Sequence, residues 1–167
     1  GVQTCALPIS RQRLQPGVMR IARQFSNQEN ILDLGCGNGQ LAKYLFSRGH
    51  QALYTGLDSN KTMLDIARQT LPEKDAITLL HRDLAARDWE AHLPEDAYDL
   101  VLAFAVLHHL PGSELRQQIL LKIASLAKRG ARFIHSEWQL LNSPRLRKRI
   151  LSRDKIDINS ENIEEGD

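Results

Sequence analysis

The chain has 167 residues, of which 42% are hydrophobic, so it is long enough for one domain with a buried core and too short for two. Its formal net charge is +2, with 22 Lys and Arg against 20 Asp and Glu, and this near balance excludes a global field that would demand a nucleic-acid partner. The longest apolar run, VLAFAVLHHL, is far shorter than the roughly 20 residues of a membrane span, and no secretory signal is evident. We therefore expect a cytoplasmic protein without a membrane segment.

Apolar residues at intervals of three and four predict helices, and short apolar runs between them predict strands. In chain order, the helices are expected at Pro16 to Phe25, Gln40 to Ser47, Lys61 to Thr70 and Ser113 to Ala127, and the strands at Ile31 to Leu34, Ala52 to Leu57, Ala76 to Leu80, Tyr98 to Ala103 and Ala131 to Ser136. Such alternation is typical of parallel crossover units. The sequence predicts an α/β fold with a doubly wound, mainly parallel sheet and helices on both faces.

The run ILDLGCGNGQL carries three alternate glycines, Gly35, Gly37 and Gly39, where the first strand meets the next helix. This position is the nucleotide-binding corner of a doubly wound sheet. Glycine suits it because a Cβ would obstruct both the tight turn and the approach of a flat ligand. A dinucleotide-binding loop would carry its third glycine at position 40, where Gln40 stands, so the spacing disfavours NAD.

Acidic residues flank this loop. Asp33 precedes the first glycine by two residues, where it would repel a pyrophosphate and attract a cationic ligand. S-adenosylmethionine carries both an ammonium and a sulfonium group. Asp58 closes the next apolar run and is expected at the same sheet edge, where its carboxylate could bind two ribose hydroxyls. The alternatives are that Asp33 only caps loop amides and that Asp58 is a helix N-cap ahead of Asn60.

Several further segments follow in the order and spacing of one known family. DLGCGNG, GLDSNKTML, HRDL, YDLVLAFAVLHHL and RGARFIHSEW together resemble the class I methyltransferases that use S-adenosylmethionine. The resemblance covers about Pro16 to Trp138 and implies a Rossmann-like fold. It also implies direct displacement on the activated methyl group, in which orientation of the reactants matters more than a dedicated base. The sequence assigns no catalytic residue and no metal ligand.

The resemblance also implies where the cofactor lies. Asp58 would bind the ribose, and Asp83 would accept a hydrogen bond from the adenine amino group beside the backbone of Leu84. Phe104 and Ala105 would border the methionine part of the cofactor. The full set of expected cofactor-binding residues is Asp33, Gly35, Cys36, Gly37, Gly39, Asp58, Ser59, Met63, Asp83, Leu84, Phe104, Ala105 and His109.

Simpler interpretations of individual residues stay open. Asp83 is also a common type of loop residue after a strand, and Cys36 is expected to pack under the cofactor rather than to act as a nucleophile. His108 and His109 could pack against the cofactor, cap a helix or contact substrate; adjacent histidines rarely bind one metal ion. His135, with Glu137 and Trp138 beyond it, could line the acceptor pocket or could be a core residue.

The two ends of the chain differ from the middle. Gly1 to Ile9 resembles translated sequencing adapter, so residues 1–10 are expected to be non-native and Cys5 with them. Residues 11–142 are expected to form a truncated methyltransferase core, and residues 143–167 a basic helix followed by a polar tail. The family's sheet has two more strands than the chain offers, so we expect a fragment that is poorly soluble alone.

The acceptor is not specified by the motifs. The basic stretch after Asn142 is either a helix that covers the sheet or an arm that binds RNA phosphates through Arg145, Arg147, Lys148 and Arg149. HSEWQLLNSPR and RQRLQPGV are similar to methyltransferases that modify wobble uridines in tRNA. The acceptor is therefore expected to be tRNA or a small molecule. The alternative functions are a non-catalytic partner subunit with the same fold and a nicotinamide-dependent reductase.

Overall fold

The computed structural model describes residues 14–137 of the chain. The elements in chain order are α1 (Pro16–Ala22), β1 (Ile31–Leu34), α2 (Gln40–Ser47), β2 (Tyr54–Asp58), α3 (Lys61–Thr70), β3 (Ile77–His81), β4 (Tyr98–Phe104), the short 3-10 helix η2 (Leu107–His109), α4 (Ser113–Leu126) and β5 (Ala127–Ser136). The segments expected at residues 1–10 and 143–167 lie outside the described residues, so that division of the chain stays a prediction.

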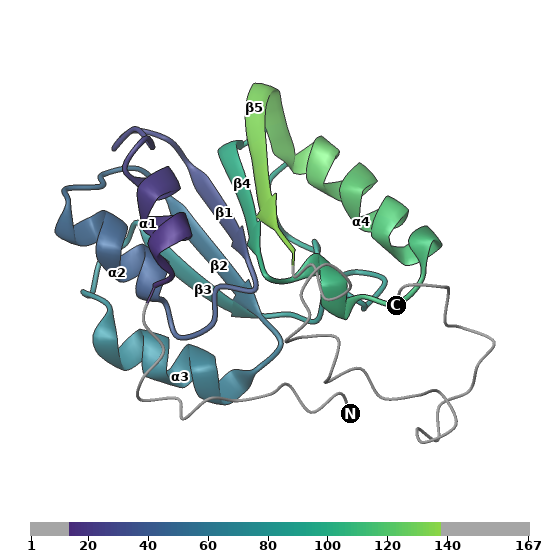
Figure 1. Ribbon diagram of the computed structural model, residues 1–167, viewed down its shortest axis with the longest axis horizontal. Helices are drawn as coiled ribbons and strands as arrows, with labels where there is room; N and C mark the ends of the chain where they lie inside the picture. Colours follow the sequence, from purple (N-terminus) through teal and green to yellow (C-terminus); the bar gives the residue numbers. More distant parts are fainter. Residues whose placement is uncertain (1–13, 138–167) are drawn as a thin grey trace, which may run out of the picture.

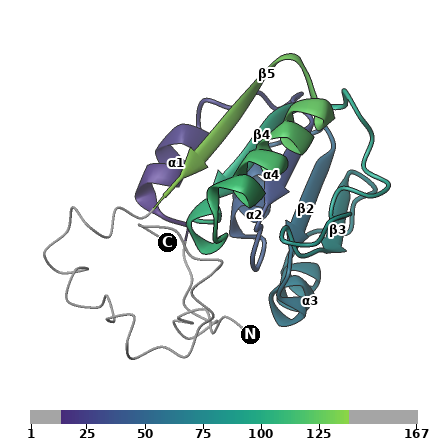
Figure 2. The ribbon, with the colours of Figure 1, turned by 90° about the vertical axis from the view of Figure 1, so that its right-hand side faces the viewer.

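The strands form one sheet in the order β3-β2-β1-β4-β5, and every neighbouring pair is parallel. Helices α1, α2 and α3 lie on one face of this sheet and α4 on the other, as Figures 1 and 2 show from two directions. The prediction of a doubly wound parallel α/β sheet is confirmed. Because all the strands run the same way, their carboxyl ends meet along one edge, at the bottom of the sheet in Figure 1.

The central strand β1 is buried on both sides, as parallel strands between two helical layers are. Ile31 belongs to the apolar cluster under α1 and α2, whereas Leu32 and Leu34 belong to the cluster under α4. Side chains alternate along a strand, so Asp33 shares the face of Ile31. A carboxyl group therefore lies among the apolar side chains of the α1 and α2 layer.

The observed boundaries agree closely with the expected ones for β1, α2 and α3. The largest error concerns the fifth strand, which begins at Ala127 rather than at Ala131 because α4 passes into β5 without a loop. Gly130, at a φ of 82°, lies within this strand, and the register of β4 with β5 shifts between Tyr98 and Leu100. Gly130 therefore lies at an irregularity within β5 and not in a turn before the strand.

The other boundaries shift by smaller amounts. Helix α1 ends at Ala22 instead of Phe25, and β2 begins at Tyr54 instead of Ala52. Strand β3 is displaced by one residue, and β4 extends one residue further than expected. Helix ends fray and strand ends depend on which backbone groups find a partner, so such differences are ordinary.

Candidate cofactor site

The loop between β1 and α2 is a tight turn built on left-handed backbone. Gly35, Gly37 and Gly39 have φ values of 72°, 56° and 75°, which other residues adopt only with strain. The backbone N–H of Gly39 donates to the carbonyl of Cys36 at 3.1 Å, and Gly39 then precedes the first residue of α2. The three alternate glycines therefore serve backbone geometry, as the sequence predicted.

The three glycines have different neighbours. A Cβ at Gly35 would collide with Cγ2 of Val106, and one at Gly39 would lie 3.1 Å from Leu71 Cδ1. A Cβ at Gly37 would meet nothing within 4 Å among the described residues. Gly35 and Gly39 are therefore packed against the protein, whereas Gly37 faces open space that a ligand can approach.

Asp58, at the carboxyl end of β2, organises this loop. Its Oδ2 accepts a hydrogen bond from the backbone N–H of Gly37 at 2.8 Å, and its Oδ1 accepts one from the backbone N–H of Asn60 at 2.8 Å. The cap of α3 is Asn60, whose Oδ1 accepts from the backbone N–H of Met63 at 3.2 Å, so the alternative of Asp58 as N-cap is wrong. A carboxylate offers about four acceptor sites, so Asp58 can still bind hydroxyl groups.

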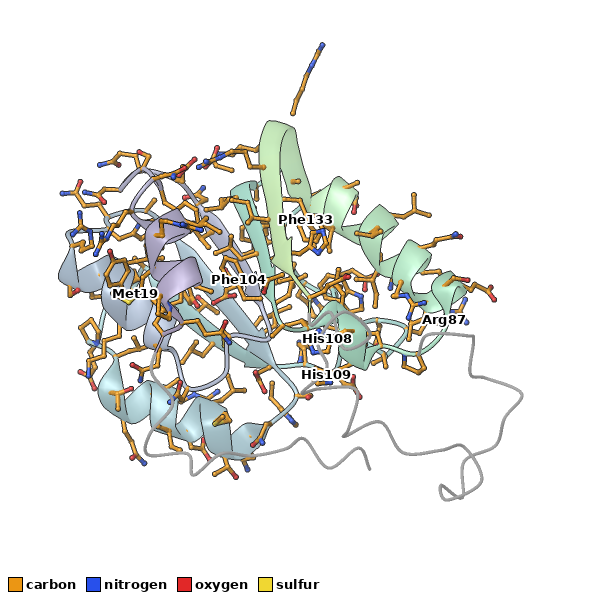
Figure 3. All side chains as sticks on the ribbon, in the orientation of Figure 1. Met19, Arg87, Phe104, His108, His109 and Phe133 are labelled. Atoms are coloured by element: carbon orange, nitrogen blue, oxygen red, sulfur yellow. The ribbon has the colours of Figure 1, made fainter. Side chains whose placement is uncertain are left out.

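A cavity of about 190 Å³ opens beside the glycine loop. Of the residues expected at the cofactor, it is lined by Asp33, Gly35, Cys36, Gly37, Phe104 and Ala105. Its other lining residues, which were not predicted as site residues, are Leu14, Gln15, Val18, Asn38, Gln40, Leu41 and Ser136. The structure thus brings the ends of β1, β4 and β5 together with α1 around one hollow. Figure 3 shows Phe104 between α1 and the lower part of the sheet.

Asp33 is the charged side chain among the described residues that line this cavity, and it is only 3% exposed. Its Oδ2 accepts a hydrogen bond from the hydroxyl of Tyr54 at 2.5 Å. Burial raises the pKa of Asp33 to about 7; the Tyr54 hydrogen bond acts in the opposite direction, and the negative charge of Asp58 adds to the rise. The alternative that Asp33 only caps backbone amides of the loop did not include this bond to a side chain.

Cys36 packs inside the loop against β2. A Cβ at Gly56 would lie 2.8 Å from the Cys36 Sγ, so the thiol packs into the space that a side chain at position 56 would need. Burial, with the charges of Asp33 and Asp58, raises the pKa of the Cys36 thiol well above its usual range. A thiol that stays protonated is a poor nucleophile, which favours the packing role.

Ser136 and Ala105 join the ends of β5 and β4. The backbone N–H of Ala105 lies 3.0 Å from the carbonyl oxygen of Ser136 and 3.1 Å from its Oγ, and both oxygens accept from it. Ala105 has a φ of 57°, an uncommon conformation for a residue with a side chain. Such strain often accompanies binding sites. The signal that could have identified Ser136 is its place at the end of a parallel strand, which puts it at the same edge as Asp33.

The residues expected around the adenosine lie outside the cavity, on the side of β2 and β3. Asp83 accepts a hydrogen bond from the backbone N–H of Ala85 at 2.9 Å. This contact is typical of a loop residue after a strand, which was the simpler interpretation of Asp83. Leu84 is buried, and a ring nitrogen of His81 lies 2.8 Å from the carbonyl oxygen of Ser59. The contacts of Asp83, Leu84, Ser59 and Met63 with a cofactor stay predictions.

The histidines occupy two places. His108 and His109 lie in η2, with ring centroids 4.2 Å apart, and Figure 3 shows them together below the end of β4. Burial and the neighbouring His109 lower the pKa of His108, while His109 is exposed. His135 is exposed, stacks on Phe133 and lies 3.6 Å from Glu137, so the expectation that it could be a core residue is wrong.

A larger and more open hollow, of about 680 Å³, lies between the end of α3 and β3. It is lined by Arg68, Leu71, Pro72, Glu73, Lys74, Asp75, Ile77 and Leu79 and includes no residue of the glycine loop. Side chains of both charges border it, and Arg68 pairs with Asp65 at 2.9 Å. It lacks the glycine loop, the convergence of strand ends and the buried acid that mark the smaller cavity, which we therefore take as the site.

Within residues 14–137, no group of three or more metal-ligating side chains comes together. No helix in that part of the chain is long and apolar enough to span a membrane. The expected RNA-contacting residues Arg145, Arg147, Lys148 and Arg149 lie outside the described residues.

Comparison with known sequences shows which family the chain resembles. The methyltransferase domain family matches residues 32–133. Trans-aconitate 2-methyltransferases from Escherichia coli O1:K1 / APEC and from Shigella flexneri are 38% and 37% identical over 106 residues. That stretch is 63% of this chain and 39% of each relative, so the chain spans about two fifths of the length of these curated relatives.

Solved structures show the same architecture. An S-adenosylmethionine-dependent methyltransferase from Mesorhizobium loti is 26% identical, with a TM-score of 0.60 over 72% of this chain and 52% of its own. A methyltransferase of the same description from Methanosarcina mazei, 22% identical, shares the fold with a TM-score of 0.64 over 83% of this chain and 65% of its own. The chain belongs to the methyltransferase domain family and has the fold of its class I, S-adenosylmethionine-dependent members.

Proposed function

We propose that this chain binds S-adenosylmethionine at the carboxyl edge of its sheet and transfers the methyl group to a small-molecule acceptor. The observation that carries the proposal is the buried carboxyl of Asp33 in a cavity whose other described lining residues are uncharged. An acid in such a place is expensive unless a cation joins it. The ammonium group of the methyl donor is such a cation, and membership of the family makes it the first candidate.

The residues at the edge fit the parts of this cofactor. Asp33 would bind the ammonium, the open face of Gly37 would admit the flat nucleoside, and Asp58 would accept from the ribose hydroxyls. A cavity of about 190 Å³ is smaller than the roughly 300–1,000 Å³ of whole ligand pockets, so it would hold the amino-acid end alone. The adenosine would then lie along Asp58 and Asp83, outside the cavity.

The chemistry asked of the protein is mostly orientation. The cofactor supplies an activated methyl group when bound, and the protein has to align it with the acceptor and exclude water. Phe104, Ala105 and Ser136 border the cavity from β4 and β5, so they would define the side from which an acceptor approaches. No general base is required by this scheme, and none is assigned.

The acceptor class rests on the relatives. Trans-aconitate is the acceptor in the names of the curated relatives, so a small organic acid is the acceptor to test first. These relatives give no support to the tRNA wobble uridine suggested by HSEWQLLNSPR and RQRLQPGV. Family membership favours methyl transfer over a nicotinamide-dependent reductase, and a cytoplasmic location stays a prediction.

Asp58→Ala tests the binding mode. We expect it to weaken binding of S-adenosylhomocysteine about tenfold to a hundredfold, because hydrogen bonds to a charged group are worth about 1.5–3 kcal/mol each. Titration calorimetry of the 167-residue chain measures this affinity. Asp65→Ala is the matched control, since that acid is exposed on α3 and pairs with Arg68. Equal affinities of wild type and Asp58→Ala would refute the ribose assignment.

Transfer of a radiolabelled methyl group tests the activity. We expect label in trans-aconitate or a related organic acid and none in total tRNA. Label in tRNA alone would overturn the small-molecule proposal. Tight S-adenosylhomocysteine binding with no transfer to either pool would favour a non-catalytic partner subunit, and NAD binding without S-adenosylhomocysteine binding would favour the reductase.

A further inference from the structure

Tyr54 is a fully buried residue that no expected site role accounts for. It begins β2, and its ring packs edge-on against Phe46 with centroids 6.4 Å apart. Its hydroxyl donates to Asp33 Oδ2 at 2.5 Å. Ring and carboxyl are thus fixed against each other inside the α1 and α2 layer, and the carboxyl residue, Asp33, lines the cavity.

The sheet register explains how the two residues meet. Tyr54 pairs with Ile31 in the ladder, and Asp33 pairs with Gly56. Tyr54, two residues before Gly56, therefore lies on the same face as Asp33, and its ring extends toward the carboxyl edge of the sheet. An aromatic ring with a terminal hydroxyl has the length to reach a carboxyl two ladder positions further along.

We propose that Tyr54 is a positioning residue for the methyl donor, whose hydroxyl holds the carboxyl of Asp33 in place at the cavity and favours the ionised form that binds the donor's ammonium. This inference rests on the proposed function, because it needs the cationic end of the donor to lie at Asp33. Tyr54 itself acts through Asp33 and lies outside the set of residues that line the cavity.

The groups that face Asp33 support this role. Burial raises the pKa of Tyr54 well above its usual value, and the charge of Asp33 adds to the rise, so the phenol stays protonated and remains a donor. The Cys36 thiol stays neutral because burial raises its pKa, and the positive charge of Arg68 on α3 opposes that rise. The described cavity residues from α1, α2, β4 and β5 are uncharged.

Only Tyr54 therefore favours ionised Asp33 among these described groups, since burial and Asp58 both oppose it. With a pKa of about 7, Asp33 changes charge in the neutral range. Affinity for an ammonium should fall as the carboxyl becomes protonated below that pH. Loss of the Tyr54 hydroxyl would raise the pKa of Asp33 further and move this fall to higher pH.

The experiment compares Tyr54→Phe with Tyr98→Phe in the full chain. Tyr98 is a matched control because it is also buried and its hydroxyl donates to Thr55 Oγ1 at 3.3 Å, away from Asp33. Calorimetry at pH 6.5 and pH 8 gives the affinity for S-adenosylhomocysteine. If the pKa of Asp33 rises by about one unit, Tyr54→Phe binds about eightfold more weakly than wild type at pH 6.5 and about twofold at pH 8. Tyr98→Phe should show the same ratio to wild type at both pH values.

A second ligand separates this effect from general damage. 5′-Methylthioadenosine carries the nucleoside and the thioether but lacks the amino-acid end, so its affinity should be equal in wild type and both variants at both pH values. A Tyr54→Phe effect that does not change with pH, or that appears equally with methylthioadenosine, would overturn the positioning role and leave the proposed function standing.

Failure of wild type to bind either ligand would overturn the proposed function and this inference together. If Tyr54→Phe does not fold, the wild type still tests the step on which the inference depends, the binding of the ammonium by ionised Asp33. Its affinity for S-adenosylhomocysteine relative to methylthioadenosine must fall between pH 8 and pH 6, and a constant ratio would refute the inference.

Discussion

Burial of the Asp33 carboxyl makes the stability of the protein depend on pH. The unfolded chain releases this proton near pH 3.8, whereas the native protein releases it near pH 7. Between these values the native state holds a proton that the unfolded state has lost, so the free energy of unfolding falls as the pH rises. Above pH 7 the free energy of unfolding is lower by about 4 kcal/mol than it would be if the carboxyl kept its ordinary pKa in the native state.

Asp33→Asn removes this cost because an amide cannot ionise. We expect the stabilisation of the variant relative to wild type to be about 2–3 kcal/mol larger at pH 8 than at pH 5, while S-adenosylhomocysteine binding is lost. Urea denaturation at the two pH values measures it. Asp88→Asn, an exposed acid, is the control and should show no such difference. A pH-independent effect of Asp33→Asn would contradict the buried-charge explanation.

At the scale of single residues, the glycine-rich motif predicted some of the residues that line the cavity. Asp33, Gly35 and Gly37 belong to the glycine-rich run, and the structure places all three on the cavity. Tyr54 and Ser136 were missed because each lies far from that run in the chain. Only the ladder of β1 with β2, and that of β4 with β5, brings them to the site.

At the scale of elements, the glycine loop is held by the turn that follows β4. We expect Gly37→Ala to cost about 1–2 kcal/mol from its left-handed backbone alone, because its Cβ would meet open space. Gly35→Ala should cost more, since its Cβ would also collide with Val106. In a Val106→Ala background the cost of Gly35→Ala should decrease toward that of Gly37→Ala, which a double-mutant cycle by denaturation measures. Equal costs in both backgrounds would show that the two segments do not pack.

Elements whose limits carry a strong local signal were predicted to the residue, whereas the start of β5, which is set by pairing, was not. Helix α3 begins after Asn60, an N-cap that the sequence displays. The early start of β5 depends on contact with β4, where Lys128 pairs with Asp99 at 2.9 Å. A local pattern around Gly130 could not reveal a partner about 30 residues away in the chain.

At the scale of the whole molecule, the hydrogen bonds of Asn30 and the cavity lie at opposite edges of the sheet. Asn30 lies at the amino edge, opposite the glycine loop, where its Nδ2 donates to the Ala97 carbonyl at 3.1 Å and its Oδ1 accepts from the Leu53 backbone N–H at 3.2 Å. Its own backbone N–H donates to Asp99 at 2.9 Å. One side chain thus ties together the beginnings of β1, β2 and β4.

Asn30→Ala is expected to lower the free energy of unfolding by about 1–3 kcal/mol, because the partly buried carbonyl of Ala97 and the exposed N–H of Leu53 lose their partner. Affinity of the folded protein for S-adenosylhomocysteine should stay within about twofold, since the site lies at the other edge. Gln28→Ala is the control, as its exposed bond to Gln51 should contribute little. Parallel losses of stability and affinity would show that the two edges are coupled.

The sequence by itself determined the class of fold, the glycine-rich corner and the family, because periodicity, turn chemistry and ordered motifs are local properties of a chain. Tertiary structure decided which side chains share the cavity, why Asp33 is held by Tyr54 and what each glycine faces. Those facts depend on burial and on parallel pairing between distant segments. A buried carboxyl acquires its altered pKa from neighbours that only the folded sheet assembles.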